Sequence, residues 1–459
     1  MYKIVSSDYQ LKTQEAKSKL DTVSESMCLA KWNQVSLHLP TGLTNSCYHP
    51  PLHKIDPSKL KDNPSSLHNT QEKLQQREMM LRGERPHGCS YCWKIEDTGE
   101  TSDRHYRSGE PWAMQDFEKI KNNPMDPTHT PRYVEVNFSH ACNLKCSYCS
   151  PQFSTTWGQE IDRYGQYPTT PPHNAPEHFT GNRKPIPNRE NNPYVEAFWK
   201  WWPDLYKTLK HFRMTGGEPM MDPNTYRVFQ YIMDHPKQDL HLNVTSNFCP
   251  ADKKLKTKYF NMASNICMEE KVEHMMQFVS VDAFGKRAEY IRHGLNFDYM
   301  MENVEEFLDR IPVRNSITFI CTYNNLSITS MDKLLEKILE LRKKYSKTYQ
   351  RVWFDVPLLR QPAWQQITLL PESYQNLHEE NIKYMEQHSG EEKGLHIFKD
   401  FEIAKMKRNL AYWRENADAS AQHKRNFYAF FSEHDRRRLT RFLNTFPEME
   451  EFWEECRNA

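Results

Sequence analysis

The sequence lacks long apolar runs and has no excess of charge of either sign. No window of the 459 residues approaches eighteen consecutive apolar residues, and the first residues carry lysine but no apolar segment like that of a secretion signal. Lys and Arg number 61 against 60 Asp and Glu, so the net charge of +1 provides no overall field to attract nucleic acid or anionic lipid. We therefore expect a cytoplasmic protein without a membrane segment, in which nucleic-acid binding would need a local basic patch.

The chain is long enough to bury a sizeable core. At about 150 residues per domain its length favours about three structural units. Apolar residues make up 37% and aromatic residues 12%, which indicates a globular protein with cores rich in rings. In a reducing compartment the eleven cysteines are expected to be thiols or metal ligands rather than disulfides.

The order of patterns along the chain predicts an α/β fold in three regions. Residues 1–126 are polar and contain four of the cysteines, which predicts a small cysteine-rich domain. In residues 127–370, six strand-like runs starting at residues 133, 211, 240, 278, 316 and 351 alternate with helical runs, as in a parallel sheet or partial (β/α)6 barrel. Seven prolines in residues 165–193 predict an insertion or lid. Residues 371–459 read as a helical C-terminal extension.

The predicted strands alternate between apolar and polar residues. Val134 and Val136 flank Glu135, for example, and the next three strands repeat this pattern. Parallel strands covered on both faces are usually apolar throughout, so the pattern predicts helices on one face and a polar interior on the other. A sheet with one face in water is the alternative. A polar interior would suit a small, charged, hydrogen-bonding ligand.

Three cysteines follow the first predicted strand with the spacing Cys-x3-Cys-x2-Cys. Cys142, Cys146 and Cys149 lie within eight residues. Thiolates are the ligands of iron-sulfur clusters, and three of them would hold three irons of a [4Fe-4S] cluster and leave the fourth iron open. The alternative is a zinc loop with a distant fourth ligand such as His140.

This loop resembles that of the radical S-adenosylmethionine (SAM) superfamily, and a second motif adds to the resemblance. The next strand ends in Gly216-Gly217-Glu218-Pro219. In the family this segment binds the methionine amine of SAM, which implies the same role here. Glycine admits close backbone approach, and Glu218 or the exposed carbonyls would accept from an ammonium group.

The resemblance extends to the fourth predicted strand and the segment after it. It implies that Ser280 and Asp282 contact the ribose or the substrate, and that Arg292 contacts the SAM carboxylate as a charged donor. Tyr148 matches a position whose backbone lies near adenine. The alternative is a pair of polar residues at a strand end with a surface arginine.

The N-terminal cysteines resemble the auxiliary-cluster pattern of SPASM and twitch radical SAM proteins. Cys28, Gly42, Cys47 and the Cys89-x2-Cys92 pair carry it, and the absence of further cysteines favours the one-cluster twitch type. The segment between Cys28 and Cys47 also reads as a hairpin turning at residues 41–42, which would bring those two cysteines together. The resemblance implies a second [4Fe-4S] cluster. This domain precedes the barrel, whereas in most relatives it follows it, and a structural zinc site is the alternative.

The family resemblance implies an enzyme. Its cluster would take an electron from an external donor of flavodoxin or ferredoxin type and cleave SAM to methionine and a 5′-deoxyadenosyl radical, which removes hydrogen from a substrate. A peptide or protein substrate is slightly favoured, and a small molecule or nucleotide is the alternative. A non-enzymatic protein with two structural zinc sites is the alternative from another class.

The C-terminal basic run predicts no binding site. Arg436, Arg437, Arg438 and Arg441 precede a run of glutamates, so we expect a solvated helical tail that compensates its own charge.

Overall fold

The computed structural model describes residues 7–390 and 394–459, and its centre is one largely parallel sheet. The strand order is β11-β10-β8-β7-β6-β4-β1-β2-β3. Six neighbouring parallel strands form the larger part: β4 (Tyr133–Asn137), β6 (His211–Thr215), β7 (Lys237–Ser246), β8 (Val272–Ser280), β10 (Ser316–Ile320) and β11 (Val352–Asp355). All six predicted strands are present, although β7 and β8 begin earlier than predicted. The α/β prediction is confirmed, and the arrangement is compatible with a partial barrel.

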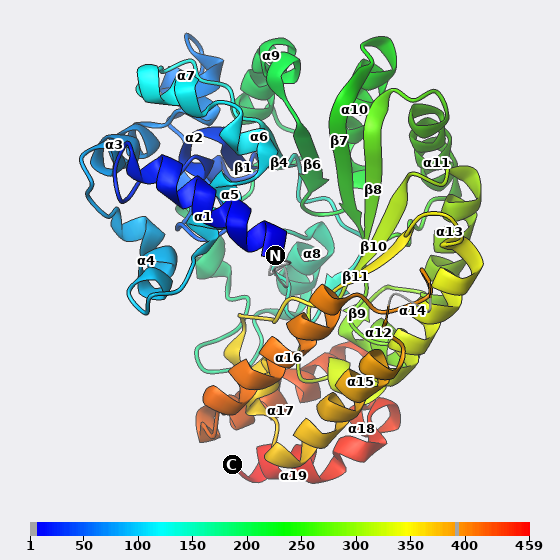
Figure 1. The fold of residues 1–459 in the computed structure, drawn as a ribbon. Helices are drawn as coiled ribbons and strands as arrows, with labels where there is room; N and C mark the ends of the chain where they lie inside the picture. Colours follow the sequence, from blue (N-terminus) through cyan, green and yellow to red (C-terminus); the bar gives the residue numbers. More distant parts are fainter. Residues whose placement is uncertain (1–6, 391–393) are drawn as a thin grey trace.

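Helices cover one face of this sheet (Figure 1). They are α9 (Pro193–Thr208), α10 (Pro223–Asp234), α11 (Lys253–Met268), α13 (Phe297–Arg310) and α14 (Met331–Tyr345). The residues that face them are buried, as Val134 and Val136 are, whereas Glu135 between them is half-buried. This confirms the predicted alternation.

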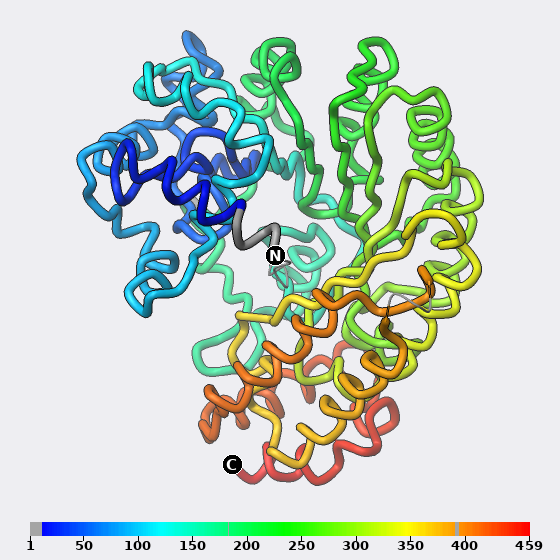
Figure 2. The backbone as a smooth tube through the Cα atoms, in the orientation of Figure 1, coloured from blue at the N-terminus to red at the C-terminus, as the bar shows by residue number. Residues whose placement is uncertain are grey.

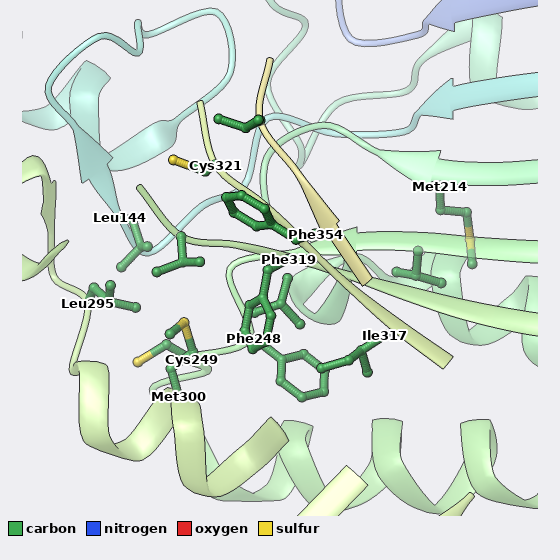
Figure 3. Packing of buried hydrophobic residues seen from close by; sticks show 14 of the residues in the cluster. Leu144, Met214, Phe248, Cys249, Leu295, Met300, Ile317, Phe319, Cys321 and Phe354 are labelled. Atoms are coloured by element: carbon green, nitrogen blue, oxygen red, sulfur yellow. The ribbon is translucent and has the colours of Figure 1, made fainter. Parts of the chain in front are cut away.

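The apolar core between sheet and helices also holds cysteines, among them Cys249 and Cys321 (Figure 3). Cys321 and Cys249 are 0% and 5% exposed and pack among residues such as Phe248, Phe319 and Phe354. Both behave as core thiols.

The N-terminal region adds three strands to the same sheet, a position in the sheet that the sequence did not predict. Strand β1 (Gln34–His38) pairs in parallel with β4 and antiparallel with β2 (Leu43–Asn45), which pairs with β3 (His53–Lys54). The predicted hairpin is confirmed, and Gly42 in its turn has φ of +63°. Val35 and Leu37 therefore belong to the core of the barrel.

A second, smaller core lies in the rest of the N-terminal region. Trp32, Trp93 and Trp112 are buried in it, together with three of the cysteines. The surrounding helices are α1 (Ser7–Asp21), α2 (Ala30–Asn33), α3 (Gln71–Leu81), α4 (Ser90–Glu96), α5 (Asp103–Ser108), α6 (Pro111–Met114) and α7 (Phe117–Asn122).

The chain then ends in helices packed below the barrel (Figure 2). These are α15 (Gln375–Gln387), α16 (Asp400–Glu415), α17 (Ala421–Arg438), α18 (Phe442–Thr445) and α19 (Glu450–Asn458), as predicted for this region. Between residues 165 and 192 the proline-rich insertion contains an isolated antiparallel bridge between Tyr167 and His173 and the short 3-10 turns Pro176–Phe179 and Gly181–Arg183. None of the described helices is long and apolar enough to cross a membrane.

Candidate functional site

Cys142, Cys146 and Cys149 lie on the loop of residues 139–150, which joins β4 to α8 (Thr155–Tyr164). We call this the cysteine loop. Its strand β5 (Lys145–Cys146) pairs antiparallel with β9 (Arg292–His293), so that Cys146 stands opposite Arg292. The start of α8 binds the loop from the other side, because Ser154 and Thr156 both donate to the carbonyl of Leu144 at 2.8 Å. The loop is therefore held from both sides by contacts within the protein.

The three thiols of this loop lie close enough to influence one another. Burial raises the pKa of Cys142, with further contributions from Cys146 and Glu218, and it raises the pKa of Cys149 to about 12. Buried thiolates without a counter-charge are unfavourable, and irons bound to them would supply that charge. Three buried or half-buried thiols on a braced loop fit the donor set of an iron-sulfur cluster.

Neither the cluster nor the zinc interpretation of this loop meets a ready-made metal site. Within residues 7–390 and 394–459, no group of three or more His, Cys, Asp or Glu side chains is arranged to hold a metal ion. His140, the fourth ligand considered for zinc, has a pKa lowered by burial and an Nδ1 atom without a hydrogen-bond partner.

The Gly-Gly-Glu-Pro turn packs directly on the cysteine loop. A Cβ atom at Gly217 would lie 2.2 Å from the carbonyl oxygen of Ala141, and Gly216 has φ of +113°. The amide of Glu218 also donates to Ala141 O at 2.6 Å. Only glycine permits this approach, so the two motifs that the sequence places far apart form one structure.

The side chain of Glu218 is occupied within the protein. It is 2% exposed, and its carboxylate accepts from Ser246 Oγ at 2.7 Å, Asn247 N at 2.8 Å and Met220 N at 3.0 Å. Burial raises its pKa. Glu218 thus fixes the turn, and Pro219 begins the 3-10 turn Pro219–Met221 that follows. Of the acceptors considered for an ammonium group, this carboxylate is therefore engaged. The carbonyls of Glu218 and Pro219 are engaged too, because they accept from Met221 N at 2.9 Å and from Asp222 N at 3.1 Å.

Asp282, Arg292 and Tyr148 form one buried group beside the cysteine loop. Arg292 Nε lies 2.8 Å from Asp282 Oδ2, and Arg292 Nη2 donates to Tyr148 Oη at 2.7 Å. Tyr148 Oη in turn donates to Asp282 Oδ2 at 2.8 Å. Asp282 is 0% exposed and Arg292 6%, so the alternative of a surface arginine does not hold. Ser280, two residues before Asp282, is half-buried at the end of β8.

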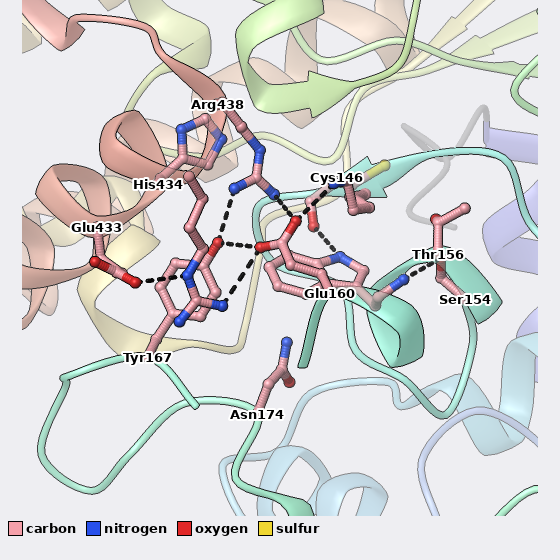
Figure 4. Close-up of polar contacts among 12 residues, drawn as sticks. Cys146, Ser154, Thr156, Glu160, Tyr167, Asn174, Glu433, His434 and Arg438 are labelled. Carbon is pink, nitrogen blue, oxygen red and sulfur yellow. Dashed lines mark hydrogen bonds and ion pairs between the residues drawn. The ribbon is translucent and has the colours of Figure 1, made fainter. Parts of the chain in front are cut away.

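A second buried group, which the sequence analysis missed, lies behind the cysteine loop (Figure 4). Glu160 of α8 lies 2.7 Å from Lys145 Nζ of the loop and 3.1 Å from Arg438 Nη2 of α17. Burial would raise the pKa of Glu160, but Arg438 and Lys145 lower it to about 2. Tyr167 of the proline-rich insertion donates to the same carboxylate at 2.6 Å.

This group corrects the prediction of a solvated basic tail. The side chains of Arg437 and Arg438 are 1% exposed, whereas that of Arg436 is 60% exposed. The prediction was wrong because it rested on the glutamates that follow the arginines in the sequence. The partner of Arg438 is instead Glu160, which lies far away in the sequence. Asn174 of the insertion also reaches the cysteine loop, where it donates to Cys149 O at 3.1 Å. The insertion and the C-terminal helices therefore both support this loop.

The four N-terminal cysteines line one small cavity. Cys28, Cys47, Cys89 and Cys92 surround a volume of about 30 Å³, together with Lys31, Arg104 and Arg107 among other residues. Burial raises the pKa of Cys28, and it raises that of Cys47 to about 12, while the nearby Lys31 lowers both. Four thiols with cations beside them are a suitable environment for thiolate ligands.

Polar residues on the inner face of the sheet connect this cavity with the barrel interior. Tyr48, next to Cys47, bonds the hydroxyl of Tyr133 at 2.9 Å and donates to Glu135 at 3.4 Å. Glu135 pairs with Arg213 at 3.6 Å, and Arg213 lies over the ring of Phe278. The sequence indicated the inward parity of Glu135 and Arg213, but no pattern indicated that Tyr48 would join them.

Comparisons with known proteins add only a remote likeness. No protein-family model matches the chain, and no curated protein matches it. Three structures of SuiB from Streptococcus suis are similar. The complex with S-adenosylmethionine has 14% identity and a TM-score of 0.36, covering 67% of this chain and 62% of that one. The complex of SuiB with precursor peptide SuiA has 14% identity and a TM-score of 0.37, and the match covers 70% of this chain and 63% of that one. The structure of SuiB alone has 13% identity and a TM-score of 0.36, and the match covers 80% of this chain and 70% of that one.

This chain therefore spans less than two thirds of the first SuiB structures. At these TM-scores the likeness assigns neither family nor function.

Proposed function

We propose that this protein is a radical SAM enzyme that removes hydrogen from its substrate. The observation that carries the proposal is the contact of Gly217 with Ala141, because it joins the three-cysteine loop to the Gly-Gly-Glu-Pro turn at backbone distance. When bound, a [4Fe-4S] cluster would supply the electron that cleaves SAM to methionine and a 5′-deoxyadenosyl radical.

Cys142, Cys146 and Cys149 would hold this cluster. The hydrogen bonds from the start of α8 to Leu144 O hold in place the loop that carries them. The carbonyl groups of Gly216 and Gly217 would accept hydrogen bonds from the amino group of SAM. Glu218 would support this role by fixing the turn, and Pro219 by beginning the 3-10 turn that follows. Ser280, half-buried on the inner face, would contact the ribose, and the backbone at Tyr148 the adenine. The buried surroundings of the loop would keep water and oxygen from a reactive intermediate.

Cys28, Cys47, Cys89 and Cys92 would hold a second, twitch-type [4Fe-4S] cluster. Four cysteines give every iron a protein ligand, so this cluster would act as an electron acceptor or a structural element rather than bind substrate directly. Lys31 and Arg104 favour the thiolate form of Cys28.

The substrate proposed is a peptide or protein, with a small molecule or nucleotide as the alternative. The inner face between the two cysteine sites offers the Glu135 carboxylate and the Arg213 guanidinium, which suit a ligand with amide or charged groups. The electron would come from an external donor of flavodoxin or ferredoxin type.

The proposal is tested by anaerobic purification with iron, sulfide and zinc counts, for the wild type and for a variant with Cys142, Cys146 and Cys149 changed to Ala. About eight irons per chain are expected, falling to about four in the variant. Added SAM and reductant should give 5′-deoxyadenosine with the wild type alone. Zinc at both sites without 5′-deoxyadenosine would contradict the proposal and favour a structural zinc protein.

A further inference from the structure

Arg292 reaches a thiol of the cysteine loop. Its Nη1 atom donates to Cys146 Sγ at 3.5 Å. The contact is fixed by the backbone, because β9 and β5 pair with Arg292 directly opposite Cys146, and Ser147 N donates to Ile291 O at 2.8 Å. The direction of this side chain is thus set by strand register as well as by its own hydrogen bonds.

Both terminal guanidinium nitrogens of Arg292 donate within the protein. Besides the bond from Nη1 to Cys146, Nη2 donates to Asp282 Oδ1 at 3.0 Å and to Tyr148 Oη at 2.7 Å. Nε lies 2.8 Å from Asp282 Oδ2 but makes no hydrogen bond. Asp282 is held in turn by the amide of Thr322 at 2.9 Å. The two terminal nitrogens that would grip a carboxylate are therefore already engaged by Cys146, Asp282 and Tyr148.

We propose that Arg292 is a positioning residue that sets the reduction potential of the cluster on the cysteine loop, through its N–H bond to Cys146. This inference rests on the proposed function. One electron from the external donor reduces the cluster, and part of the added negative charge falls on the thiolate sulfurs. An N–H donor on a cation stabilises that reduced form, so it raises the potential. The Asp282 carboxylate opposes this effect while it aims the guanidinium at the sulfur.

The test compares Arg292→Gln, Arg292→Lys and Asp282→Asn in the full chain with both clusters. A dye-mediated titration follows the electron paramagnetic resonance signal that changes when SAM is added, and so reports this cluster alone. Arg292→Gln is expected to disfavour reduction about tenfold, a shift of about 59 mV to lower potential for a one-electron couple. Arg292→Lys should shift it less in the same direction. Asp282→Asn should shift it to higher potential.

The matched control is Arg132→Gln. Arg132 also forms a two-point pair with a carboxylate, Asp116, but it precedes β4, at the end of the strand remote from the cysteine loop. Arg132→Gln should leave the reduction potential of the cluster on the cysteine loop the same as in the wild type.

An unchanged potential in Arg292→Gln, accompanied by weaker SAM binding, would overturn the inference and return Arg292 to the SAM carboxylate. Should Arg292→Gln fail to hold iron, Arg292→Lys and Asp282→Asn decide: shifts of opposite sign support the inference, and two unshifted potentials overturn it. Failure of the proposed function is seen separately, because the wild type would then contain no iron on this loop.

Discussion

The Glu160 carboxylate and the Arg438 guanidinium lie 3.1 Å apart, with both side chains at most 2% exposed. The first belongs to the helix after the cysteine loop and the second to the C-terminal helices. Because Glu160 also binds Lys145 of the loop, this pair fastens the end of the chain to the candidate cluster site.

Removal of Arg438 should be strongly destabilising. Arg438→Ala leaves the buried Glu160 with too little positive charge, which typically costs about 3–5 kcal/mol. Chemical denaturation of the purified protein measures this loss. Arg436→Ala serves as the control, since this side chain is 60% exposed and its loss should change stability by about 0.5 kcal/mol or less. Equal effects of the two substitutions would contradict the importance of the buried pair.

The same carboxylate should make stability depend on pH. The pKa of Glu160 is about 2 in the folded protein, below the ordinary value of about 4.3. Its contribution is therefore complete above pH 4.3 and is lost as the pH falls toward 2. The stability difference between the wild type and Glu160→Gln, followed by denaturation between pH 6 and pH 3, should shrink on acidification. A constant difference would argue against an ionised Glu160.

The approach of Gly217 to Ala141 should not tolerate a methyl group. In Gly217→Ala the new Cβ would meet a backbone oxygen at 2.2 Å, so the turn must move away from the cysteine loop. We expect loss of about four irons and of SAM binding, measured by metal analysis and calorimetry. Gly158→Ala is the matched control, because a Cβ there meets nothing within 4 Å and lies inside α8. It should keep the iron and gain up to about 1 kcal/mol of stability.

Loss of one N-terminal cysteine should distinguish the role of the N-terminal cluster from that of the cluster on the cysteine loop. Cys89→Ala is expected to lower the iron content by about four. If the second cluster accepts an electron, SAM cleavage should continue while product formation stops, as followed by chromatography of both products. Loss of soluble protein would instead indicate a structural role. Cys456→Ala, a buried thiol of α19, should leave the iron content unchanged.

Much of this architecture was predictable because its signals are local. The alternation of Val134, Glu135 and Val136 reports which face each strand buries, and the turn at Gly42 lies within a single short hairpin. The spacing of Cys142, Cys146 and Cys149 likewise requires only one loop. Such patterns depend only on residues close together in the sequence, so they can be read without knowing the fold.

The remaining features depend on residues that only the fold brings together. The burial of Arg438 requires Glu160, and the engagement of Arg292 requires Asp282 and the register of β9 against β5. The pairing of β1 with β4 joins two segments separated by residues 39–132, which supply part of the second core. No local pattern in any of these segments indicates its distant partner.

The β1–β4 pairing also limits how early β1 can complete its pairing while the chain is being synthesised. Strand β1 ends at His38 and β4 begins at Tyr133, so the 94 residues 39–132 must be made between them. At about 5–20 residues per second this takes about 5–19 s. Throughout that interval the β4-facing edge of β1 has no strand to bind, and an unpaired edge can pair with another chain. The strand that joins the N-terminal cysteines to the barrel is thus also the segment of the nascent chain most in need of protection.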